Sequence, residues 1–127
     1  MRIKIVLAGA LLALPTAAIA GSAAFADPAG CSAATTSFGL SSGELRALGE
    51  GRCSTSANRN LQVEVKQDLS LQPDPVVTHT NDNGSKTYYS GVAQSCDSGN
   101  TSTYYGRTFF TTNTTYHDSS HKKLTVC

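Results

Sequence analysis

Three side chains of the types used in acid–base hydrolysis are spread along this chain: Glu64, Arg107 and His117. A carboxylate can act as a base, an imidazole can act as an acid, and a guanidinium can stabilise the negative charge that develops between them. Cleavage of a phosphodiester would use all three together. A small hydrolase of ribonuclease type is therefore one hypothesis for the function of this chain.

The order Glu64, Arg107, His117 is similar to that in small secreted microbial ribonucleases, which carry these residue types on a sheet with the histidine near the C-terminus. The resemblance implies a base, a cationic stabiliser and an acid, in that order. It covers three scattered residues, and the aromatic-rich segment around the histidine of those enzymes is not reproduced around Tyr116-His117-Asp118. The plain alternative is that Glu64 is a solvent-facing carboxylate and Arg107 a salt-bridge partner.

Two other patterns have ordinary explanations. His117 and His121 stand four residues apart and would share one side of a strand, with His79 or Asp118 as a third metal ligand. That spacing indicates a metal site mainly on a helix, whereas this segment is polar, so we expect solvated histidines. The serine in Asp97-Ser98-Gly99 has the surroundings of a turn and lacks a nucleophile elbow. We expect neither a metal nor another cofactor.

An aromatic β-hairpin is predicted in the second half of the chain. A strand from about residue 86 to 96 would turn at residues 97–100 and return along residues 103–112, which places Tyr88 opposite Phe109. Cross-strand aromatic pairs stabilise a sheet by roughly 0.2–1 kcal/mol each. Aromatic side chains would occupy both sides of this hairpin, so one side is expected to be core and the other a second-layer contact or a binding surface.

Tyrosine and arginine favour recognition, because they offer rigid amphipathic contact area and bidentate hydrogen bonding. For each tyrosine, core packing is at least as good an explanation as contact with a partner. The predicted contact residues are Tyr89, Tyr104, Tyr105, Arg107, Phe110 and Tyr116.

The first 26 residues have the pattern of a signal peptide. Arg2 and Lys4 precede an apolar run from Ile5 to Ala20, and Ala24-Phe25-Ala26 fits a cleavage site. Removal of the leader would take away two of the ten Lys/Arg residues. The remaining eight would nearly balance the nine Asp/Glu residues, so the mature chain would be almost neutral. A nearly neutral chain is not attracted electrostatically to nucleic acid or to an anionic membrane surface. We expect one secreted, monomeric domain at residues 27–127.

The four cysteines all lie in that domain, and an even count in a small exported chain indicates two disulfides. Three pairings are possible. We expect Cys31–Cys53 and Cys96–Cys127, because they close the shortest loops, of about 22 and 31 residues.

Short strand patterns separated by turn signals predict an all-β fold: a disulfide-stapled antiparallel β-sandwich of six to eight short strands. The clearest half-buried strand is residues 61–66, where apolar and polar residues alternate. Ser41 and Glu44 fit a capping box, so either one or two helical turns or an irregular loop is expected there. Residues 81–84 predict a turn.

Two sequence-adjacent disulfides in a small exported all-β chain, the second closing on Cys127, resemble the actinobacterial α-amylase inhibitors. The resemblance covers the cysteine order and the strand pattern, and it implies a non-catalytic, disulfide-pinned sandwich. The inhibitory Trp-Arg-Tyr segment of that family has no counterpart, because the chain has no Trp. Amylase inhibition is therefore not implied.

The composition favours a secreted, non-enzymatic protein that binds an extracellular protein or glycan, with inhibition as one form of that binding. The ribonuclease-type hydrolase is the first alternative. A cell-surface or structural component is the second.

The disulfide pairing is directly testable. Peptide mapping of the unreduced protein is expected to yield one peptide pair joined by Cys31–Cys53 and one joined by Cys96–Cys127. A peptide that joins Cys53 to Cys96 would contradict the predicted order of the domain.

Overall fold

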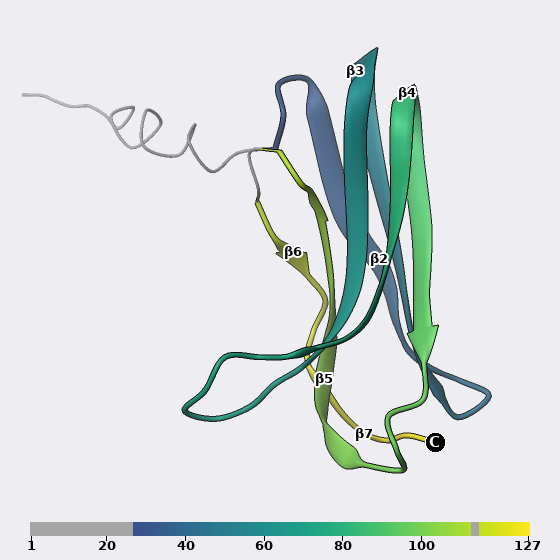
Figure 1. Cartoon of the computed structure of the whole chain (residues 1–127), viewed down its shortest axis with the longest axis vertical. Helices are drawn as coiled ribbons and strands as arrows, with labels where there is room; N and C mark the ends of the chain where they lie inside the picture. The colour runs from purple at the N-terminus through teal and green to yellow at the C-terminus, as the bar shows by residue number, and fades with distance from the viewer. Residues whose placement is uncertain (1–26, 113–114) are drawn as a thin grey trace, which may run out of the picture.

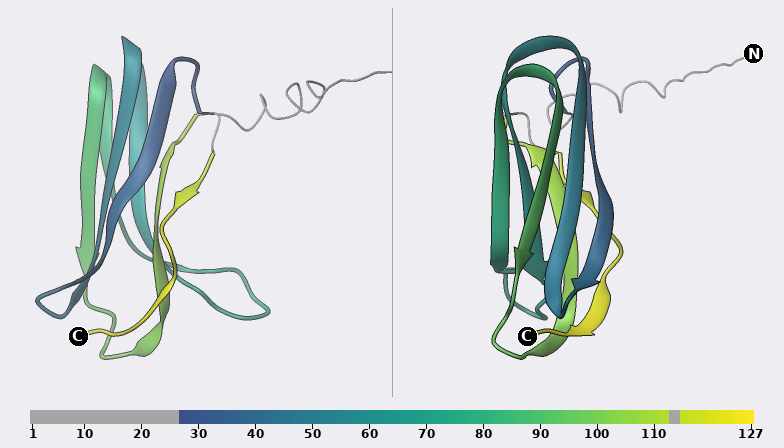
Figure 2. Two further views of the ribbon diagram at one scale, coloured as in Figure 1. Left: turned by 180° about the vertical axis from the view of Figure 1, so that it is seen from behind. Right: turned by 90° about the vertical axis from the view of Figure 1, so that its right-hand side faces the viewer.

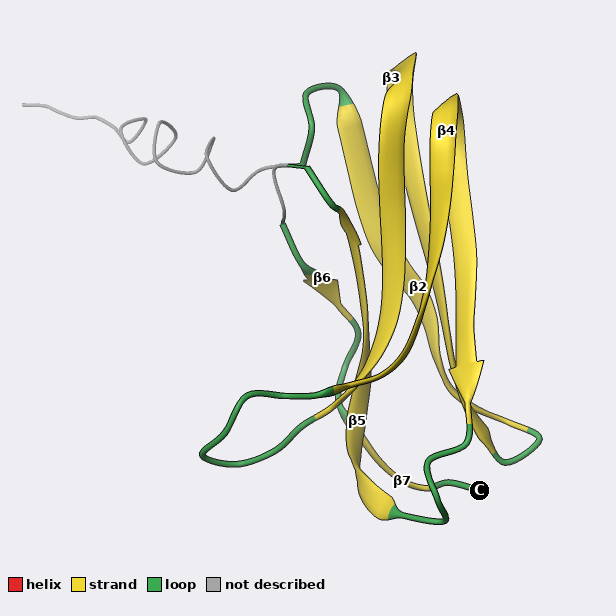
Figure 3. Ribbon diagram, viewed as in Figure 1, coloured by secondary structure: helices red, strands yellow, loops and turns green. Residues whose placement is uncertain are grey.

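The computed structural model describes residues 27–112 and 115–127 (Figure 1), so the predicted leader lies outside the described residues. All regular elements in the described residues are strands (Figure 3), and the prediction of an all-β fold is confirmed. These strands form one antiparallel sheet. They are β2 (Cys31–Ser41), β3 (Glu44–Gln67), β4 (Val76–Ser95), β5 (Thr101–Phe110), β6 (His117–Asp118) and β7 (Lys122–Thr125).

The sheet is organised around β3, which pairs with β2, β4 and β5. Residues 45–52 of β3 lie between β2 and residues 88–95 of β4. Residues 61–66 lie between residues 76–82 of β4 and the strand β5. The short strands β6 and β7 pair with the other edge of β5.

β3 and β4 bend over together, so that their two halves stack face to face (Figure 2). The register between them shifts at this bend, between Arg52 and Ala57. We call the half that contains β2 the β2 layer, and the half that contains β5 the β5 layer. The sequence predicted only short strands, whereas β3 and β4 have 24 and 20 residues and belong to both layers.

The side chains between the layers form the core. Leu61, Val63 and Val65 are at most 1% exposed, which confirms the half-buried strand predicted from their alternation. Every second residue of β5 also points inward, and Val126 covers the open end near the C-terminus. The buried cluster consists of Phe38, Leu45, Ala47, Cys53, Leu61, Val63, Val65, Tyr89, Ala93, Tyr104, Phe110 and Val126.

The bend of β4 is held by side-chain hydrogen bonds of Tyr89 and Asp82. The hydroxyl of Tyr89 lies 2.8 Å from the carbonyl oxygen of Gly84 and 3.1 Å from that of Ala57. The carboxylate of Asp82 also accepts from Lys86 Nζ at 2.6 Å and, across the layers, from the backbone N–H of Ser90 at 3.0 Å. The predicted turn at residues 81–84 is therefore wrong, because these residues continue β4 into the bend.

The predicted pairing of Tyr88 with Phe109 is also wrong, because β4 and β5 do not pair. Tyr88 lies opposite Arg52, and Phe109 lies opposite Gln62, both on β3. The turn between β4 and β5 joins the two layers instead of neighbouring strands. The backbone N–H of Asp97 in this turn donates to the carbonyl of the last residue at 2.6 Å, which fixes the crossover to the C-terminus.

Neither the helical turn nor the irregular loop expected after Ser41 is present. Ser42 and Gly43 have φ values of 52° and 81°, and Ser41 pairs with Glu44. Two successive positive φ values are typical of a two-residue hairpin turn. Leu45 consequently begins a strand and enters the core.

Both predicted disulfides are confirmed, Cys31–Cys53 and Cys96–Cys127. The first ties the start of β2 to the bend of β3. The second ties the end of β4 to the C-terminus. The first disulfide thus joins directly paired residues within the β2 layer, and the second fixes the crossover between the layers to the C-terminus.

Close approach of the layers at Gly49 leads to a stability prediction. A Cβ added there would lie 2.7 Å from Val63 and 2.8 Å from a carbon of Thr108. We expect Gly49→Ala to lower the unfolding free energy by about 1–3 kcal/mol, as overpacking does. The control is Gly39→Ala, whose nearest heavy atom would be Lys122 Nζ at 3.9 Å. Urea unfolding that finds both variants equally stable would contradict the packing of the layers.

Candidate functional site

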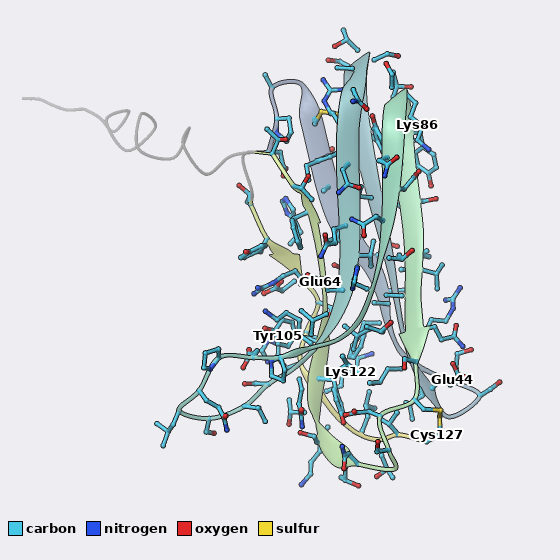
Figure 4. The ribbon with its side chains drawn as sticks, in the orientation of Figure 1. Glu44, Glu64, Lys86, Tyr105, Lys122 and Cys127 are labelled. Carbon is cyan, nitrogen blue, oxygen red and sulfur yellow. A yellow bond between two sulfur atoms is a disulfide. The ribbon has the colours of Figure 1, made fainter. Side chains whose placement is uncertain are left out.

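The outer face of the β5 layer carries several of the residues that sequence analysis considered for chemistry. Glu64 and Tyr105 of this layer are labelled in Figure 4. Glu64 is at its centre, with His79 opposite it on β4 and Arg107 opposite it on β5. Residues directly opposite in antiparallel strands point to the same side of a sheet. We call this surface the Glu64 face; it consists of Gln62, Glu64, Lys66, His79, Asn81, Tyr105, Arg107, Phe109, Tyr116, Asp118 and His121.

Four of the six predicted contact residues are covered by the fold, which corrects their assignment to a binding surface. Tyr89, Tyr104 and Phe110 point into the core and are at most 1% exposed. Tyr105 points outward but is only 2% exposed, because the C-terminal segment lies over it. The aromatic residues of the predicted hairpin therefore no longer support a binding function.

Tyr116 is the predicted contact residue that remains well exposed, at 54%. Its ring lies over the guanidinium of Arg107, with 3.9 Å from Cζ to the ring centroid, and meets Phe109 edge-on at 5.0 Å. One side of the ring is thus fixed against the protein. The rest of the ring is presented to solvent at the edge of β5.

Arg107 is held in one orientation. Its Nε and Nη2 donate to the two carboxylate oxygens of Asp118 at 2.8 and 3.0 Å, and its side chain is only 16% exposed. The hydrogen bonds from Arg107 to Asp118 raise the pKa of the guanidinium, against the opposing effect of burial. The ring of Tyr105, two residues earlier on β5, also lies near the guanidinium, 5.5 Å from Cζ to the centroid. Arg107 therefore serves mainly to position Tyr116, because its own hydrogen-bonding groups are engaged by Asp118 and are less available to a ligand.

The stack continues along β5 through Tyr105. Its ring lies parallel to that of His121 at 4.2 Å, and His121 Nδ1 is 2.8 Å from a carboxylate oxygen of Asp68. The hydroxyl of Tyr105 donates to Asp74 at 2.7 Å. Burial first, and then this hydrogen bond, raise the pKa of Tyr105. The pKa of Asp74 is lowered by the backbone N–H of Leu69 and by the Tyr105 hydroxyl.

Glu64 is a buried carboxylate on what is otherwise the solvent side of the sheet, with 7% exposure. Its Oε2 accepts from Gln62 Nε2 at 2.6 Å, and Gln62 Oε1 in turn accepts from Asn81 Nδ2 at 3.1 Å. None of the ion pairs among the described residues includes Glu64. Its cross-strand neighbour Arg107 is already engaged by Asp118.

The three residues of the hydrolase hypothesis are not brought together. Glu64 and Arg107 share one face, but His117 alternates with Asp118 along β6 and points to the other side. The ring of His117 lies 3.0 Å from both carboxylate oxygens of Asp27. The histidine beside Glu64 is instead His79. Sequence spacing could not predict this position, because the register between β3 and β4 determines which residue lies opposite Glu64.

A shallow groove lies elsewhere, between β2 and the C-terminal segment. Its volume is about 390 Å³, and hydroxyl side chains such as Thr36, Ser37 and Ser120 line it. Lys122 Nζ spans the groove and donates to the carbonyl of Phe38 at 2.7 Å. This ammonium covers the unpaired edge of β2, which is a common protection of sheet edges.

No family model matches this chain, and neither a curated protein nor a solved structure is significantly similar to it. Within residues 27–112 and 115–127, no group of three or more His, Cys, Asp or Glu side chains could hold a metal ion. No helix in those residues is long and apolar enough to cross a bilayer. The chemistry of the Glu64 face is therefore the basis for a functional proposal.

The raised pKa of Tyr105 predicts a measurable alkaline titration. Because the neutral phenol is favoured in the folded state, its contribution to stability is complete below about pH 10 and is lost as the pH rises through the folded-state pKa. Absorbance of tyrosinate should show two tyrosines ionising late, Tyr105 and also Tyr104, whose pKa burial and Asp97 raise to about 12. Tyr105→Phe should remove one of them.

Asp74→Asn is the companion variant. We expect it to lower the pKa of Tyr105 only in part, since burial is the larger cause of the shift. If Tyr105→Phe keeps both late-ionising tyrosines and Asp74→Asn leaves the titration unchanged, Tyr105 is not buried against Asp74.

Proposed function

We propose that this chain is a secreted, non-enzymatic protein that binds an extracellular protein or glycan through the Glu64 face. The observation that carries the proposal is the exposed ring of Tyr116, fixed on Arg107 beside a buried carboxylate. A rigid aromatic ring at a surface loses little conformational entropy on binding. Such an arrangement is suited to recognition because its members are already in place.

Secretion is supported by the signal-peptide pattern of residues 1–26 and by the cysteine chemistry. Two disulfides, with no free cysteine among the described residues, are compatible with an oxidising extracellular environment. One joins β2 to β3, and the other ties the end of β4 to the C-terminus. Inhibition of an extracellular enzyme is one form that binding by such a domain takes.

The hydrolase alternative keeps one specific observation in its favour. Glu64 and Arg107 do lie opposite each other, and His79 flanks Glu64 on the same face. A base and an acid on one face are required for phosphodiester cleavage. Against it, two nitrogens of the guanidinium are engaged by Asp118, which reduces its capacity to stabilise a second anion.

Tyr116→Ala tests the proposal, and the chain offers a matched control. Tyr88 is also exposed, at 41%, and is also stacked with an arginine, Arg52, but on the outer face of the β2 layer. Oxidised protein of residues 27–127 would be immobilised and exposed to culture supernatant and cell-wall extract of the producing cells. We expect a saturable partner that Tyr88→Ala retains and Tyr116→Ala loses.

Equal retention by both variants would move the binding surface away from the Glu64 face. If nothing is retained by the unmodified protein and RNA is cleaved, with activity lost in Glu64→Gln, the hydrolase replaces the binding proposal. If neither binding nor cleavage is found, a structural role becomes the better explanation.

A further inference from the structure

We propose that the ligand of the Glu64 face is a neutral glycan, with Glu64 accepting hydrogen bonds from its hydroxyl groups and Tyr116 stacking on one of its sugar rings. This inference rests on the proposed binding function and names its ligand class. It follows from four features of the face: a carboxylate oxygen without a protein donor, the balanced charges around it, a set of hydrogen-bonded amides and the open ring of Tyr116.

Glu64 has an oxygen that no protein donor occupies. A carboxylate can accept about four hydrogen bonds. Oε2 receives one from Gln62, whereas Oε1 receives none from any residue that the structure describes. Oε1 is not among the buried side-chain atoms of the described residues that lack a partner, so it remains open to solvent although Glu64 as a whole is only 7% exposed. A ligand that brings hydroxyl donors to Oε1 would therefore gain charge-assisted hydrogen bonds, which are short and strong.

The charges around Glu64 favour hydroxyl donors over an ammonium or guanidinium group. Arg107 is its cross-strand neighbour, and Lys66 is two residues further along the same side of β3. Arg107 is ion-paired with Asp118, so the formal charges of Glu64, Lys66, Arg107 and Asp118 balance. A face with balanced charges favours neither a cationic nor an anionic ligand, so charge complementarity indicates a neutral, polyhydroxylated ligand instead of a basic peptide.

The amides beside Glu64 are oriented by a chain of hydrogen bonds. Asn81 Nδ2 donates to Gln62 Oε1 at 3.1 Å and to Asn60 Oδ1 at 3.3 Å, and Gln62 Nε2 donates to Glu64. The network branches at Asn81, which donates to both Asn60 and Gln62, and its second branch leads through Gln62 to Glu64. Amides and carboxylates together complement sugar hydroxyls, which both donate and accept.

Tyr116 supplies the apolar part of the site. One side of its ring is occupied by Arg107 at 3.9 Å, so the exposed 54% of the residue includes the opposite side. Sugar rings present C–H groups on one side and hydroxyls at their rim. Stacking on Tyr116 would use the C–H side, while the rim reaches polar side chains on β3 and β4.

The extent of the face fits an oligosaccharide better than a single sugar. His79, Glu64, Arg107 and Asp118 form one row across β4, β3, β5 and β6. Neighbouring strands are about 4.8 Å apart, so the row spans roughly 14 Å. A ligand lying across the strands would touch the carboxylate near the middle and the tyrosine near one end.

The β2 layer provides the contrast. It has an exposed tyrosine on an arginine, Tyr88 with Arg52 at 4.6 Å, and a nearby carboxylate, Glu50. Glu50 is already paired with Arg52 at 3.7 Å, and its side chain is 33% exposed. The carboxylate of Glu50 is thus paired with a guanidinium and is hydrated by solvent. The two layers thus carry similar residue types, but a carboxylate lacking an ionic partner stands beside the tyrosine only on the Glu64 face.

The test is a binding measurement with soluble neutral oligosaccharides. Oxidised protein of residues 27–127 would be titrated by calorimetry with hexasaccharides of glucose, mannose, xylose and N-acetylglucosamine, and with an acidic hexasaccharide of galacturonate for comparison. We expect saturable binding of at least one neutral hexasaccharide. Glu64→Gln, which preserves shape, and Tyr116→Ala should each raise its Kd by about tenfold or more.

Matched variants on the other layer make the result specific. Glu50→Gln and Tyr88→Ala should leave the Kd within about twofold, since a surface substitution remote from a site rarely matters. Amide NMR spectra of all four variants would establish that each is folded. Equal affinity of Glu64→Gln and the unmodified protein would overturn the role of Glu64, and binding of the acidic sugar alone would overturn the neutral ligand class.

Failure of the glycan inference is distinguishable from failure of the proposed function. If no hexasaccharide binds but a protein is retained from the extracts and is lost in Tyr116→Ala, the binding function stands and the glycan inference is wrong. If hexasaccharides do not bind and nothing is retained, both are wrong.

Discussion

The structure depends on the joint bend of β3 and β4, which lets one sheet cover itself. Small residues make this possible where the halves meet: at Gly49 and Gly51, an added Cβ would collide with side chains of the opposite layer. Tyr89 fixes the bend from beneath by its hydroxyl, which lies near two carbonyl groups of the bent strands. Because β3 and β4 run through both layers, with β3 between β4 and the third strand in each, the pairing of these two strands sets the core and the outer faces. A change at the bend would therefore alter both layers together.

The Glu64 face follows from that pairing. Residues 61–66 of β3 alternate, so the side chains that build the core and those that build the face come from one strand. β4 adds His79 on one side of Glu64, and β5 adds Arg107 on the other. The C-terminal segment then packs along β5, where Asp118 engages Arg107 and His121 covers Tyr105. Exposure of Tyr116 and burial of Tyr105 are consequences of where this segment lies.

Local sequence patterns correctly predicted the structural features that depend on residues close together in the sequence. The alternation at residues 61–66 indicated a half-buried strand, and the shortest loops indicated the disulfide partners, and both are confirmed. The supposed hairpin of β4 and β5 was wrong, because a turn between layers has the same residue types as a turn between paired strands. The burial of Tyr104 and Phe110 was missed for the same reason. Which aromatic residues are covered depends on long-range packing, and so does the placement of His79 beside Glu64.

The most direct measurement is a set of cross-strand nuclear Overhauser effects in the oxidised domain, because recognition by the Glu64 face requires β3 to lie between β4 and β5. We expect backbone contacts from Glu64 to both His79 and Arg107, and from Arg107 to Asp118. Together they would establish that these side chains form one row. Contacts between residues 88–95 and residues 103–110 in the register of a direct hairpin would contradict it, since Glu64 would then no longer stand beside Arg107.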